Sequence, residues 1–363
     1  MPITPDAVKK TLYAQVLVAI VRSKLLPHYD KTINGANLAI FGGGDIFTDT
    51  DQHFPLKIAA AASIVRDRNI PIAIHAVGVG PDWSAESVSL FNEAFAGADI
   101  CWTSVRDDLS RNRWRRQFRD SDVPAPNVTM DPGLLAGKAF APTADASLQR
   151  RNRPLIGLCV TDPSTLRAQS DGDGATQFAP GIDFYKACIK ALGDNDCDVL
   201  LFTNGAAEDE ALLHRSVPAA SIADNTDGAL LVAKQSKTPA ELVETIRRCD
   251  AVVGCQLYAS IIAHALKIPH VGVAASPMLN AFFDMVSRRD FLLGPNNATP
   301  KDIAAAVARA LETPIGDSAH ALIVNRVERD FDELARILQR AADGKRPVTA
   351  SAARARRARA ARR

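Results

Sequence analysis

The sequence predicts an α/β protein with two Rossmann-like domains, each built on a parallel sheet, that face each other across a cleft. Short apolar runs of strand length alternate with longer segments of helical pattern, which is typical of parallel sheets wrapped by crossover helices. The alternation occurs in two series, separated by the polar, proline-containing linker 138–153. A chain of 363 residues with 47% hydrophobic content can build two cores of ordinary size.

The first series predicts an N-terminal domain over residues 1–137. Its strands are expected at short apolar runs, at 37–41, 70–77 and 100–105, with a last short run at 128–132. Its helices are expected at the amphipathic segments 8–26, 56–68, 84–95 and 107–118.

The second series predicts a C-terminal domain over residues 154–298. Its expected strands are 154–160, 198–203, 229–232, 250–254 and 270–273, and its expected helices include 184–192, 208–216, 256–266 and 279–286. Between strand and helix, the loop 170–174 is rich in glycine and aspartate. Thr238-Pro239-Ala240-Glu241 predicts a further helix start, with threonine as the cap, proline in the first turn and glutamate three residues beyond the cap.

The C-terminal region 299–343 predicts two helices, 300–311 and 319–342, that we expect to pack across both domains. The tail 344–363 is an Arg/Ala-rich segment expected to be disordered, and its last ten residues carry six arginines and no acid. Without these arginines the net charge of +2 becomes −4 (2 − 6), which argues against a basic nucleic-acid-binding protein. The tail could instead contact an anionic membrane surface.

The six cysteines show no Cys-x-x-Cys pair and no Cys/His metal spacing, so we expect small core or boundary residues in a reducing compartment, and neither a metal nor a cofactor. The first ten residues lack a basic segment followed by an apolar stretch, and the apolar run 16–21 is too short to span a bilayer. We expect a cytoplasmic protein, with a place at the inner face of the membrane left open.

Three consecutive glycines, Gly42, Gly43 and Gly44, follow the expected strand 37–41. Glycines at the carboxyl end of a parallel strand permit positive φ angles and close approach of a ligand, and unpaired N–H groups there can hold an anion. A second turn, Gly78-Val79-Gly80-Pro81, follows the next expected strand. A tight strand-to-helix connection is the alternative interpretation of either turn.

Five motifs in order resemble the polysaccharide pyruvyl transferase family over roughly residues 37–290. They are Phe41-Gly42-Gly43-Gly44 with Asp49, Gly78-x-Gly80-Pro81, Val105-Arg106-Asp107-Asp108-Leu109-Ser110, Asp131-Pro132, and Glu241 followed by Arg248-Cys249-Asp250-Ala251-Val252-Val253-Gly254. The resemblance implies a GT-B-like fold. It also implies transfer of the enolpyruvyl unit of phosphoenolpyruvate to sugar hydroxyls, forming a pyruvate ketal on a bacterial glycan or its lipid-linked precursor.

The chain departs from the family at the helix that begins near residue 256. Family members typically carry Arg-Leu-His there, with the histidine as acid and the arginine on the donor, and this chain has Gln256-Leu257-Tyr258. A lysine expected after the next strand is replaced by Ala275-Ser276-Pro277-Met278. The family's opening strand with its Asn-x-Gly-Asp turn also has no counterpart. The fold is therefore a firmer inference than the chemistry.

Candidate site residues follow from the turns and the resemblance. Arg106 is a candidate clamp for a carboxylate or phosphate, or else the partner of Asp107 or Asp131 in a salt bridge. Asp45 and Asp49 are candidates to activate or bind a sugar hydroxyl, or else to cap the helix after the glycine loop. The predicted catalytic residues are Tyr258 and Asp49, and the predicted substrate-binding residues are Gly42, Gly43, Gly44, Asp45, Gly78, Gly80, Arg106 and Gln256.

Tyr258 is a poor replacement for an acidic histidine, because tyrosine titrates near pH 10, and it could instead hydrogen-bond to or stack on a ligand. Among the histidines, His53 is expected at a helix cap or the surface, His75 in the core, and His264 in a structural role. His28, His214 and His270 carry no motif.

Three hypotheses remain open. The first is a divergent pyruvyl transferase with phosphoenolpyruvate as donor and a glycan or lipid-linked sugar as acceptor, acting in surface or exopolysaccharide synthesis. The second is a GT-B glycosyltransferase that uses a nucleotide sugar. The third is a repurposed family member that binds a glycan or a protein without catalysis.

Overall fold

A computed structural model describes residues 15–49, 53–142, 152–169, 180–216, 230–273, 276–294 and 298–343. The chain divides into two compact units: unit 1 comprises Met1–Asp131 and Glu328–Arg363, and unit 2 comprises Pro132–Val327. The division falls six residues before the end expected for the N-terminal domain. The loop 170–174, most of the expected linker and the Arg/Ala-rich tail lie outside the described residues.

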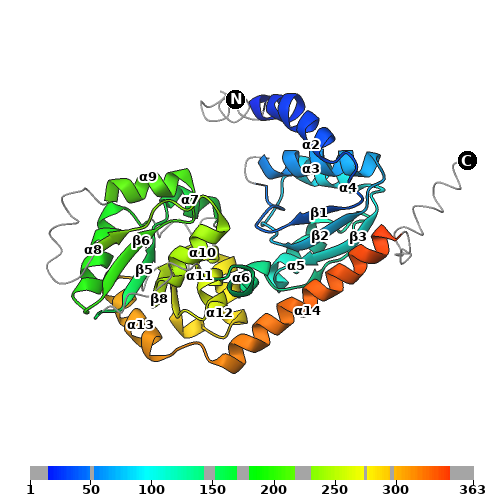
Figure 1. Ribbon diagram of the computed structural model, residues 1–363. Helices are drawn as coiled ribbons and strands as arrows, with labels where there is room; N and C mark the ends of the chain where they lie inside the picture. The colour runs from blue at the N-terminus through cyan, green and yellow to red at the C-terminus, as the bar shows by residue number, and fades with distance from the viewer. Residues whose placement is uncertain are drawn as a thin grey trace, which may run out of the picture. The chain divides into compact units, whose positions relative to one another are not determined.

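Unit 1 is built on a four-stranded parallel sheet with the strand order β1-β2-β3-β4. Its strands are β1 (Ala39–Gly42), β2 (Ile72–Val77), β3 (Ile100–Val105) and β4 (Asn127–Val128). Its helices are η1 (Val21–Leu25, a π-helix), α2 (Leu26–Thr32), α3 (His53–Asp67), α4 (Ala85–Phe95) and α5 (Asp108–Gln117), all drawn in blue and cyan in Figure 1. The expected alternation of strands and helices is therefore confirmed here.

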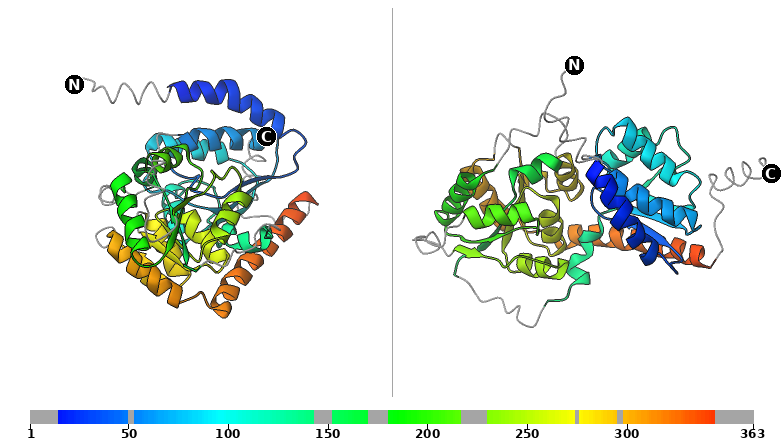
Figure 2. Two further views of the ribbon diagram at one scale, coloured as in Figure 1. Left: turned by 60° about the vertical axis from the view of Figure 1, so that its left-hand side comes forward. Right: turned by 90° about the horizontal axis from the view of Figure 1, so that it is seen from above.

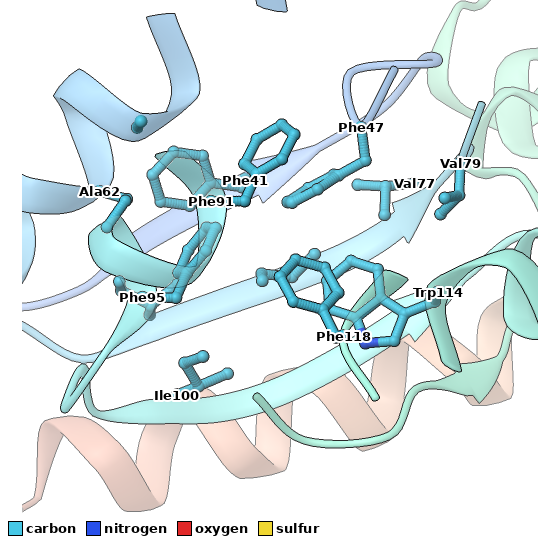
Figure 3. Close-up of a cluster of buried hydrophobic side chains, with 14 of the residues drawn as sticks. Phe41, Phe47, Ala62, Val77, Val79, Phe91, Phe95, Ile100, Trp114 and Phe118 are labelled. Atoms are coloured by element: carbon cyan, nitrogen blue, oxygen red, sulfur yellow. The ribbon is translucent and has the colours of Figure 1, made fainter. Parts of the chain in front are cut away.

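An aromatic core fills the space between this sheet and its helices. Phe47, in the loop after β1, is fully buried. Its ring centroid lies 5.0–6.5 Å from those of five other rings: Trp83, Phe91, Phe95, Trp114 and Phe118 (Figure 3). Phe47 also pairs with Val79 in a parallel β-bridge. The loop after the glycine turn is thus anchored by burial of a large ring, which favours a fixed loop conformation.

The other face of the unit 1 sheet is covered by the last part of α14 (Asp317–Ala342). Leu334 packs with Ala73 and Trp102, and the Phe331 ring lies edge-on to His75 at 5.2 Å. The course of α14 along this sheet is drawn in Figure 1. Asp330 accepts a hydrogen bond from the Met130 backbone N–H. Residues near the end of the chain therefore complete the unit formed by its beginning.

Unit 2 contains a six-stranded parallel sheet with the order β10-β9-β8-β5-β6-β7, and helices cover both of its faces (Figure 2). Its strands are β5 (Leu155–Cys159), β6 (Asp198–Phe202), β7 (Leu230–Val232), β8 (Ala251–Gly254), β9 (His270–Val273) and β10 (Leu292–Leu293). The order is typical of Rossmann folds, with the chain reversing direction across the sheet between β5 and β8.

Some of the helices of unit 2 begin at a capping side chain with proline in the first turn. The helices of this unit are η2 (Pro132–Leu135), α6 (Ala136–Ala139), α7 (Pro163–Gln169), α8 (Ile182–Gly193), α9 (Ala207–Ser216), α10 (Pro239–Arg247), α11 (Leu257–Ala265), α12 (Pro277–Met285), η5 (Arg289–Phe291) and α13 (Pro300–Glu312). The capping box predicted at Thr238 and Glu241 is confirmed at α10. Helix α13 lies wholly within unit 2.

Candidate functional site

The carboxyl edge of the unit 1 sheet gathers the turns that the sequence singled out. Arg106, directly after β3, forms an ion pair with Asp45, which follows the glycine turn after β1. Gly78, directly after β2, lies beside this pair, and a Cβ atom there would overlap Asp45 and come within 2.7 Å of Arg106 Nη2. Glycine is required at position 78 because the ion pair occupies the space that a side chain would need.

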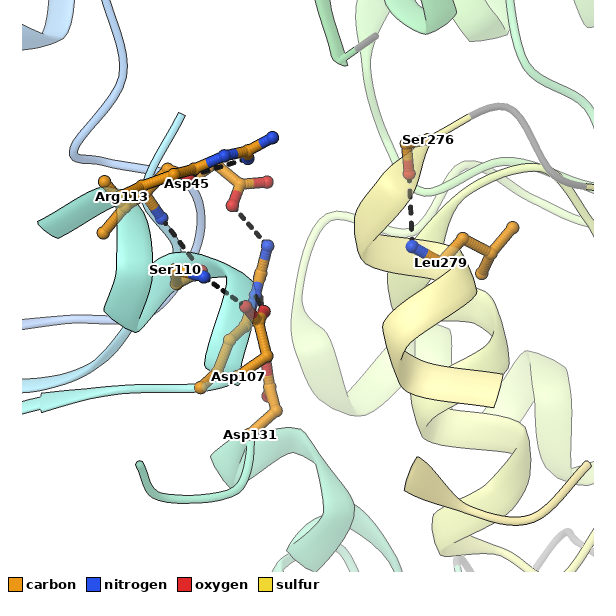
Figure 4. Close-up of polar contacts among 9 residues, drawn as sticks. Asp45, Asp107, Ser110, Arg113, Asp131, Ser276 and Leu279 are labelled. Atoms are coloured by element: carbon orange, nitrogen blue, oxygen red, sulfur yellow. Dashed lines mark hydrogen bonds and ion pairs between the residues drawn. The ribbon is translucent and has the colours of Figure 1, made fainter. Parts of the chain in front are cut away.

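Three carboxylates surround Arg106. Besides Asp45, Asp107 Oδ2 lies 3.6 Å from Nε and Asp131 Oδ2 lies 3.9 Å from Nη1, so loops after β1, β3 and β4 converge on one guanidinium (Figure 4). The Arg106 side chain is only 4% exposed, whereas that of Asp45 is 33% exposed. Both alternatives left open for Arg106, pairing with Asp107 or with Asp131, are therefore present, and the shortest contact is a third one, with Asp45.

The Asp45 carboxyl combines an ion pair with access to solvent. Burial raises its pKa, the neighbouring Arg106 lowers it, and the carboxylates of Asp107 and Asp131 raise it further, so that the net direction is upward. A carboxylate with a raised pKa, held in place by a buried cation, is suited to accept a proton from a substrate hydroxyl.

The glycine turn has the backbone geometry expected of it at two of its three positions. Gly43 and Gly44 have φ angles of +77° and +57°. The turn is fastened to the end of β2, since Gly78 N–H donates to the Gly44 carbonyl at 2.8 Å and Gly80 N–H donates to the Phe47 carbonyl at 2.8 Å. Successive residues with positive φ can direct backbone N–H groups toward an anion.

Asp49 is hydrogen-bonded to residues outside the Asp45–Arg106 cluster. Its two carboxylate oxygens accept hydrogen bonds from the Ser84 backbone N–H and the Ser87 hydroxyl, at the start of α4. The alternative of helix capping is thus present, although the helix is α4 and not α3, the one that follows the loop. Asp49 stays a predicted catalytic residue whose visible contacts are structural.

The end of β2 carries a β-bulge next to Gly78. Pairing with β3 shifts register between Ile74 and Val77, and Ala76 has a φ angle of +50°. Ser104 Oγ accepts a hydrogen bond from Ala76 N–H at 3.0 Å and lies 3.2 Å from His75 Nδ1. Burial lowers the pKa of His75, in agreement with its predicted place in the core. The bulge bends the end of β2 and so orients the turn at Gly78, and such features are common near functional sites.

At the carboxyl edge of unit 2, Gln256 belongs to a buried polar network. It is 6% exposed, and its amide donates to Asp209 Oδ2 at 2.8 Å and accepts from Asn204. Asp209 is fully buried and also accepts from the Asp162 backbone N–H at 2.7 Å. Burial raises the pKa of Asp209, and these hydrogen bonds oppose that shift. The network lies where the chain reverses between β5 and β8, the usual ligand position in such sheets.

Tyr258 stands two residues beyond Gln256, in the first turn of α11, and is 40% exposed. Gln256 therefore points into the unit while Tyr258 remains accessible. The partners of Gln256 were missed in the sequence because Asp209 and Asn204 belong to no motif. The sequence offers one indication of this network, which is that Asn204 directly follows the expected strand 198–203.

The remaining titratable residues show no nucleophilic arrangement. Five of the six cysteines are buried and all six are free, and burial raises the pKa of both Cys188 and Cys255 to about 12. Their predicted place in the core or at its boundary is confirmed, with Cys101 as the half-buried one. Among the described residues, no helix is long and apolar enough to cross a membrane.

Comparison with known proteins now identifies the family. The sequence model of the family described as polysaccharide pyruvyl transferase matches residues 6–277, three quarters of the chain. The chain belongs to the polysaccharide pyruvyl transferase family. This confirms the resemblance carried by the five motifs, and it supports a transferase. No curated protein sequence matches the chain.

Solved structures show the same fold class. UDP-GlcNAc 2-epimerase from Methanocaldococcus jannaschii is similar with a TM-score of 0.52 and 11% identity, covering 86% of this chain and 81% of the epimerase. The S. aureus MnaA–UDP structure gives a TM-score of 0.51 and 10% identity, with coverage of 87% and 82%. The calicheamicin glycosyltransferase CalG4 gives 0.43 and 14%, with coverage of 94% and 82%. At these identities the two structures with TM-scores above 0.5 show the fold alone, and the predicted α/β, GT-B-like class is confirmed.

Proposed function

We propose that this pyruvyl transferase-family protein transfers the pyruvyl group of phosphoenolpyruvate to two hydroxyls of a sugar, forming a ketal. Two C–O bonds form at C2 of the donor, and the C2–O bond to phosphate breaks. One hydroxyl proton ends on C3, which becomes a methyl group, and the other leaves with phosphate. The acceptor is a glycan or its lipid-linked precursor in surface or exopolysaccharide synthesis. The place of action is the cytoplasm, at or near the inner face of the membrane.

The observation that carries this proposal, beside the family match, is the Asp45–Arg106 pair across Gly78. Asp45 is the accessible member of the pair, and its raised pKa suits a general base. Arg106 holds the carboxylate in one orientation and supplies positive charge at the carboxyl edge. In this proposal Asp45 deprotonates the acceptor hydroxyl, and Arg106 acts as its positioning residue and as a cation toward the donor.

The donor carries a carboxylate and a phosphate, which require oriented N–H groups and positive charge. The positive φ angles of Gly43 and Gly44 support a role for their N–H groups toward the donor's anionic groups. Gly80 keeps the turn close to the end of β2. Within unit 2, the accessible Tyr258 offers a hydroxyl for a neutral hydrogen bond and a ring on which a sugar can stack, and Gln256 lies in the buried network with Asp209.

The test measures phosphate release from phosphoenolpyruvate with a panel of sugar acceptors, together with calorimetric titration of phosphoenolpyruvate. Asp45→Asn should lower turnover by about 100-fold or more, as expected for loss of a general base. Asp108→Asn removes an equal charge from a 71% exposed side chain two residues after Arg106 and should leave turnover unchanged. Equal turnover of Asp45→Asn and the wild type would exclude Asp45 as the base.

A second candidate function is transfer from a nucleotide sugar, favoured by the network at the reversal point of the unit 2 sheet. Asp209, Gln256 and Asn204 are amide and carboxylate groups, which suit sugar or ribose hydroxyls better than an anion. Titration with UDP-sugars and GDP-sugars in parallel with phosphoenolpyruvate separates the two functions. Saturable binding of a nucleotide sugar alone would favour glycosyl transfer, and binding of neither donor would favour a non-catalytic role.

A further inference from the structure

A cluster of histidines lies in unit 2 at the edge of the sheet opposite the carboxyl ends of the strands. His270 is the first residue of β9, and His264 lies in the last turn of α11, which begins at the carboxyl edge and runs back. His320, in the first turn of α14, contributes a third ring. The ring centroid of His264 lies 5.5 Å from that of His270 and 5.8 Å from that of His320.

A buried arginine accompanies these rings. Arg288, which follows α12, is 7% exposed, and its Cζ lies 3.9 Å from the centroid of the Phe291 ring. Its Nη1 donates to the Thr313 carbonyl at 2.8 Å, while Nε and Nη2 are buried without a hydrogen-bond partner. Over the part of the chain that the structure describes, no carboxylate forms an ion pair with Arg288. Buried charges are normally paired, so this guanidinium lacks its usual compensation.

The neighbouring rings also present unused nitrogen atoms. Both ring nitrogens of His264 and Nε2 of His270 are buried without a hydrogen-bond partner, and the two side chains are 2% and 0% exposed. Burial, with the positive charge of Arg288 as a further cause, lowers the pKa of His264 to about 3 and that of His270 to about 4. Two guanidinium nitrogens can therefore donate hydrogen bonds that no described group accepts, and three ring nitrogens join them when both imidazoles are protonated, because His270 Nδ1 already donates to the Ile268 carbonyl.

We propose that this cluster binds one small oxyanion of the sulfate or phosphate class between Arg288, His264 and His270. A guanidinium offers parallel N–H groups that match two oxygens of such an ion, and imidazoles supply further donors. The near-complete burial of the three side chains restricts the ligand to a small ion. His320, which is only half-buried, marks the accessible side of the cluster.

A metal ion does not fit these residues. Within the described ranges, no group of three or more histidine, cysteine, aspartate or glutamate side chains has the arrangement to hold one. The guanidinium of Arg288 would also repel a cation. The site is therefore assigned to a negative ligand, and it is independent of the catalytic function proposed for the carboxyl edges.

Anion binding should be coupled to proton uptake. A bound anion favours the charged form of His264 and His270. Arg288 opposes it at both rings, His270 and His320 oppose it at His264, and Lys267 acts on His320. Asp317, which pairs with Lys267, is the acidic group that acts on His320. Affinity should therefore rise as the pH falls, by up to about tenfold per pH unit for each proton taken up.

Sulfate is the probe of choice because its charge does not change between pH 6 and 8. We expect saturable calorimetric binding of one sulfate per chain at pH 6, weaker binding at pH 8, and no equivalent signal from chloride at the same ionic strength. In histidine labelled with ¹⁵N, sulfate should shift two ring signals toward the protonated form. Absence of saturable binding to the folded wild-type protein across this pH range would overturn the proposal.

Two neighbouring arginines provide a matched pair of variants. Arg288→Gln should lose sulfate binding, whereas Arg289→Gln, which changes the adjacent and 56% exposed arginine, should keep it. Should Arg288→Gln fail to fold, Arg288→Lys retains one charge without the parallel N–H groups and should weaken binding at least tenfold. Equal binding by Arg288→Lys and the wild type would contradict the assignment.

Binding at the proposed donor site must be distinguished from binding here. Sulfate bound at the histidine cluster should not be displaced by phosphoenolpyruvate, and Arg288→Gln should bind phosphoenolpyruvate as the wild type does. Displacement of all sulfate by phosphoenolpyruvate would place the anion at the donor site and overturn this assignment. Failure of phosphoenolpyruvate to bind at all would count against the proposed catalytic function and leave the sulfate result intact.

Discussion

Arg106 in unit 1 and Arg288 in unit 2 are both buried at an edge of the sheet of their unit, and the two arginines differ in their surroundings. Arg106, 4% exposed, lies among three carboxylates at the carboxyl edge of unit 1. Arg288, 7% exposed, lies among histidine and phenylalanine rings at the opposite edge in unit 2. The first cation is compensated within the protein and can position a reactive carboxylate. Among the described residues, the Arg288 guanidinium has no such carboxylate, so it favours the neutral form of the nearby histidines and the binding of an external anion.

The largest expected effect is a loss of folding stability at low pH, caused by the histidines beside Arg288. His264 and His270 have folded-state pKa values of about 3 and about 4, below the 6.5 of an unfolded histidine. Between pH 6.5 and 4 the unfolded chain binds protons that the folded chain does not. The contribution of the two histidines to folding stability is therefore fully present above this range and is lost as the pH falls through it. At pH 5 the loss should be about 2 kcal/mol for each ring.

Urea unfolding between pH 5 and 8 measures this loss. Saturating sulfate should reduce it, because the anion compensates the charge that protonation creates. His214→Gln, which removes a 74% exposed histidine, should leave the pH profile unchanged. A profile that is flat between pH 5 and 7 would contradict the burial of two neutral histidines in this cluster.

The next largest effect is expected from the loss of Arg106. Arg106→Ala removes the cation between Asp45, Asp107 and Asp131, and the buried carboxylates then repel one another. We expect a loss of about 3 kcal/mol of folding stability, at the lower end for a broken buried pair because Asp45 is partly exposed. Loss of measurable binding of phosphoenolpyruvate should accompany it.

Calorimetric melting at pH 7.5 gives the stability change, and titration gives the donor affinity. Arg111→Ala, which breaks an exposed ion pair with Asp108, should cost less than about 1 kcal/mol and retain donor binding. If Arg106→Ala melted like the wild type, the three carboxylates would not depend on this arginine, and the contrast between the two units would fail.

A smaller effect is expected from Gly78→Ala, which tests the geometry of the Asp45–Arg106 pair without removing a charge. The added methyl group would overlap Asp45 and crowd Arg106, so one side chain must move. We expect a cost of about 2 kcal/mol and a loss of turnover larger than the loss of stability would explain.

Gly316→Ala serves as the control, because a Cβ atom there meets no other atom within 4 Å. It should change neither melting nor turnover. Full activity of Gly78→Ala would show that the close approach of the three groups is not needed for function.

These contrasts also show which features the sequence could predict. The strand ends, the glycine turns and Arg106 were visible because β-strand runs, glycine clusters and a basic residue after a strand are local patterns. The fold class, the family and the cap at Thr238 followed from such patterns and are confirmed. The bulge at Ala76 and the burial of Phe47 depend on packing between distant segments, which local patterns do not encode.

The partners of the buried charges were the least predictable features. Arg106 was expected to pair with Asp107 or Asp131, and its shortest contact is with Asp45, 61 positions earlier. His264 was expected to be structural, and His270 carried no motif. Their proximity to Arg288 arises because α11, β9 and the turn after α12 meet at one edge of the sheet. Electrostatic compensation is a property of the folded chain, so it becomes visible only when side chains from several elements are placed together.

The smallest effect is expected from a further buried arginine, introduced by Gln256→Arg. Gln256 donates to Asp209, a fully buried carboxylate, so an arginine at this position would have a partner of opposite charge. If a buried guanidinium is tolerated whenever a carboxylate faces it, the change in folding stability should stay within about 1 kcal/mol. Gln256→Met, which has a similar volume but no donor, should cost about 1–2 kcal/mol because Asp209 loses one hydrogen bond. Urea unfolding at pH 7.5 compares the two variants.

The same arginine restores one family position, so phosphoenolpyruvate affinity should rise in Gln256→Arg and not in Gln256→Met. A greater loss of stability in Gln256→Arg than in Gln256→Met would show that Asp209 cannot compensate a guanidinium, and that the rule drawn from Arg106 does not extend to unit 2.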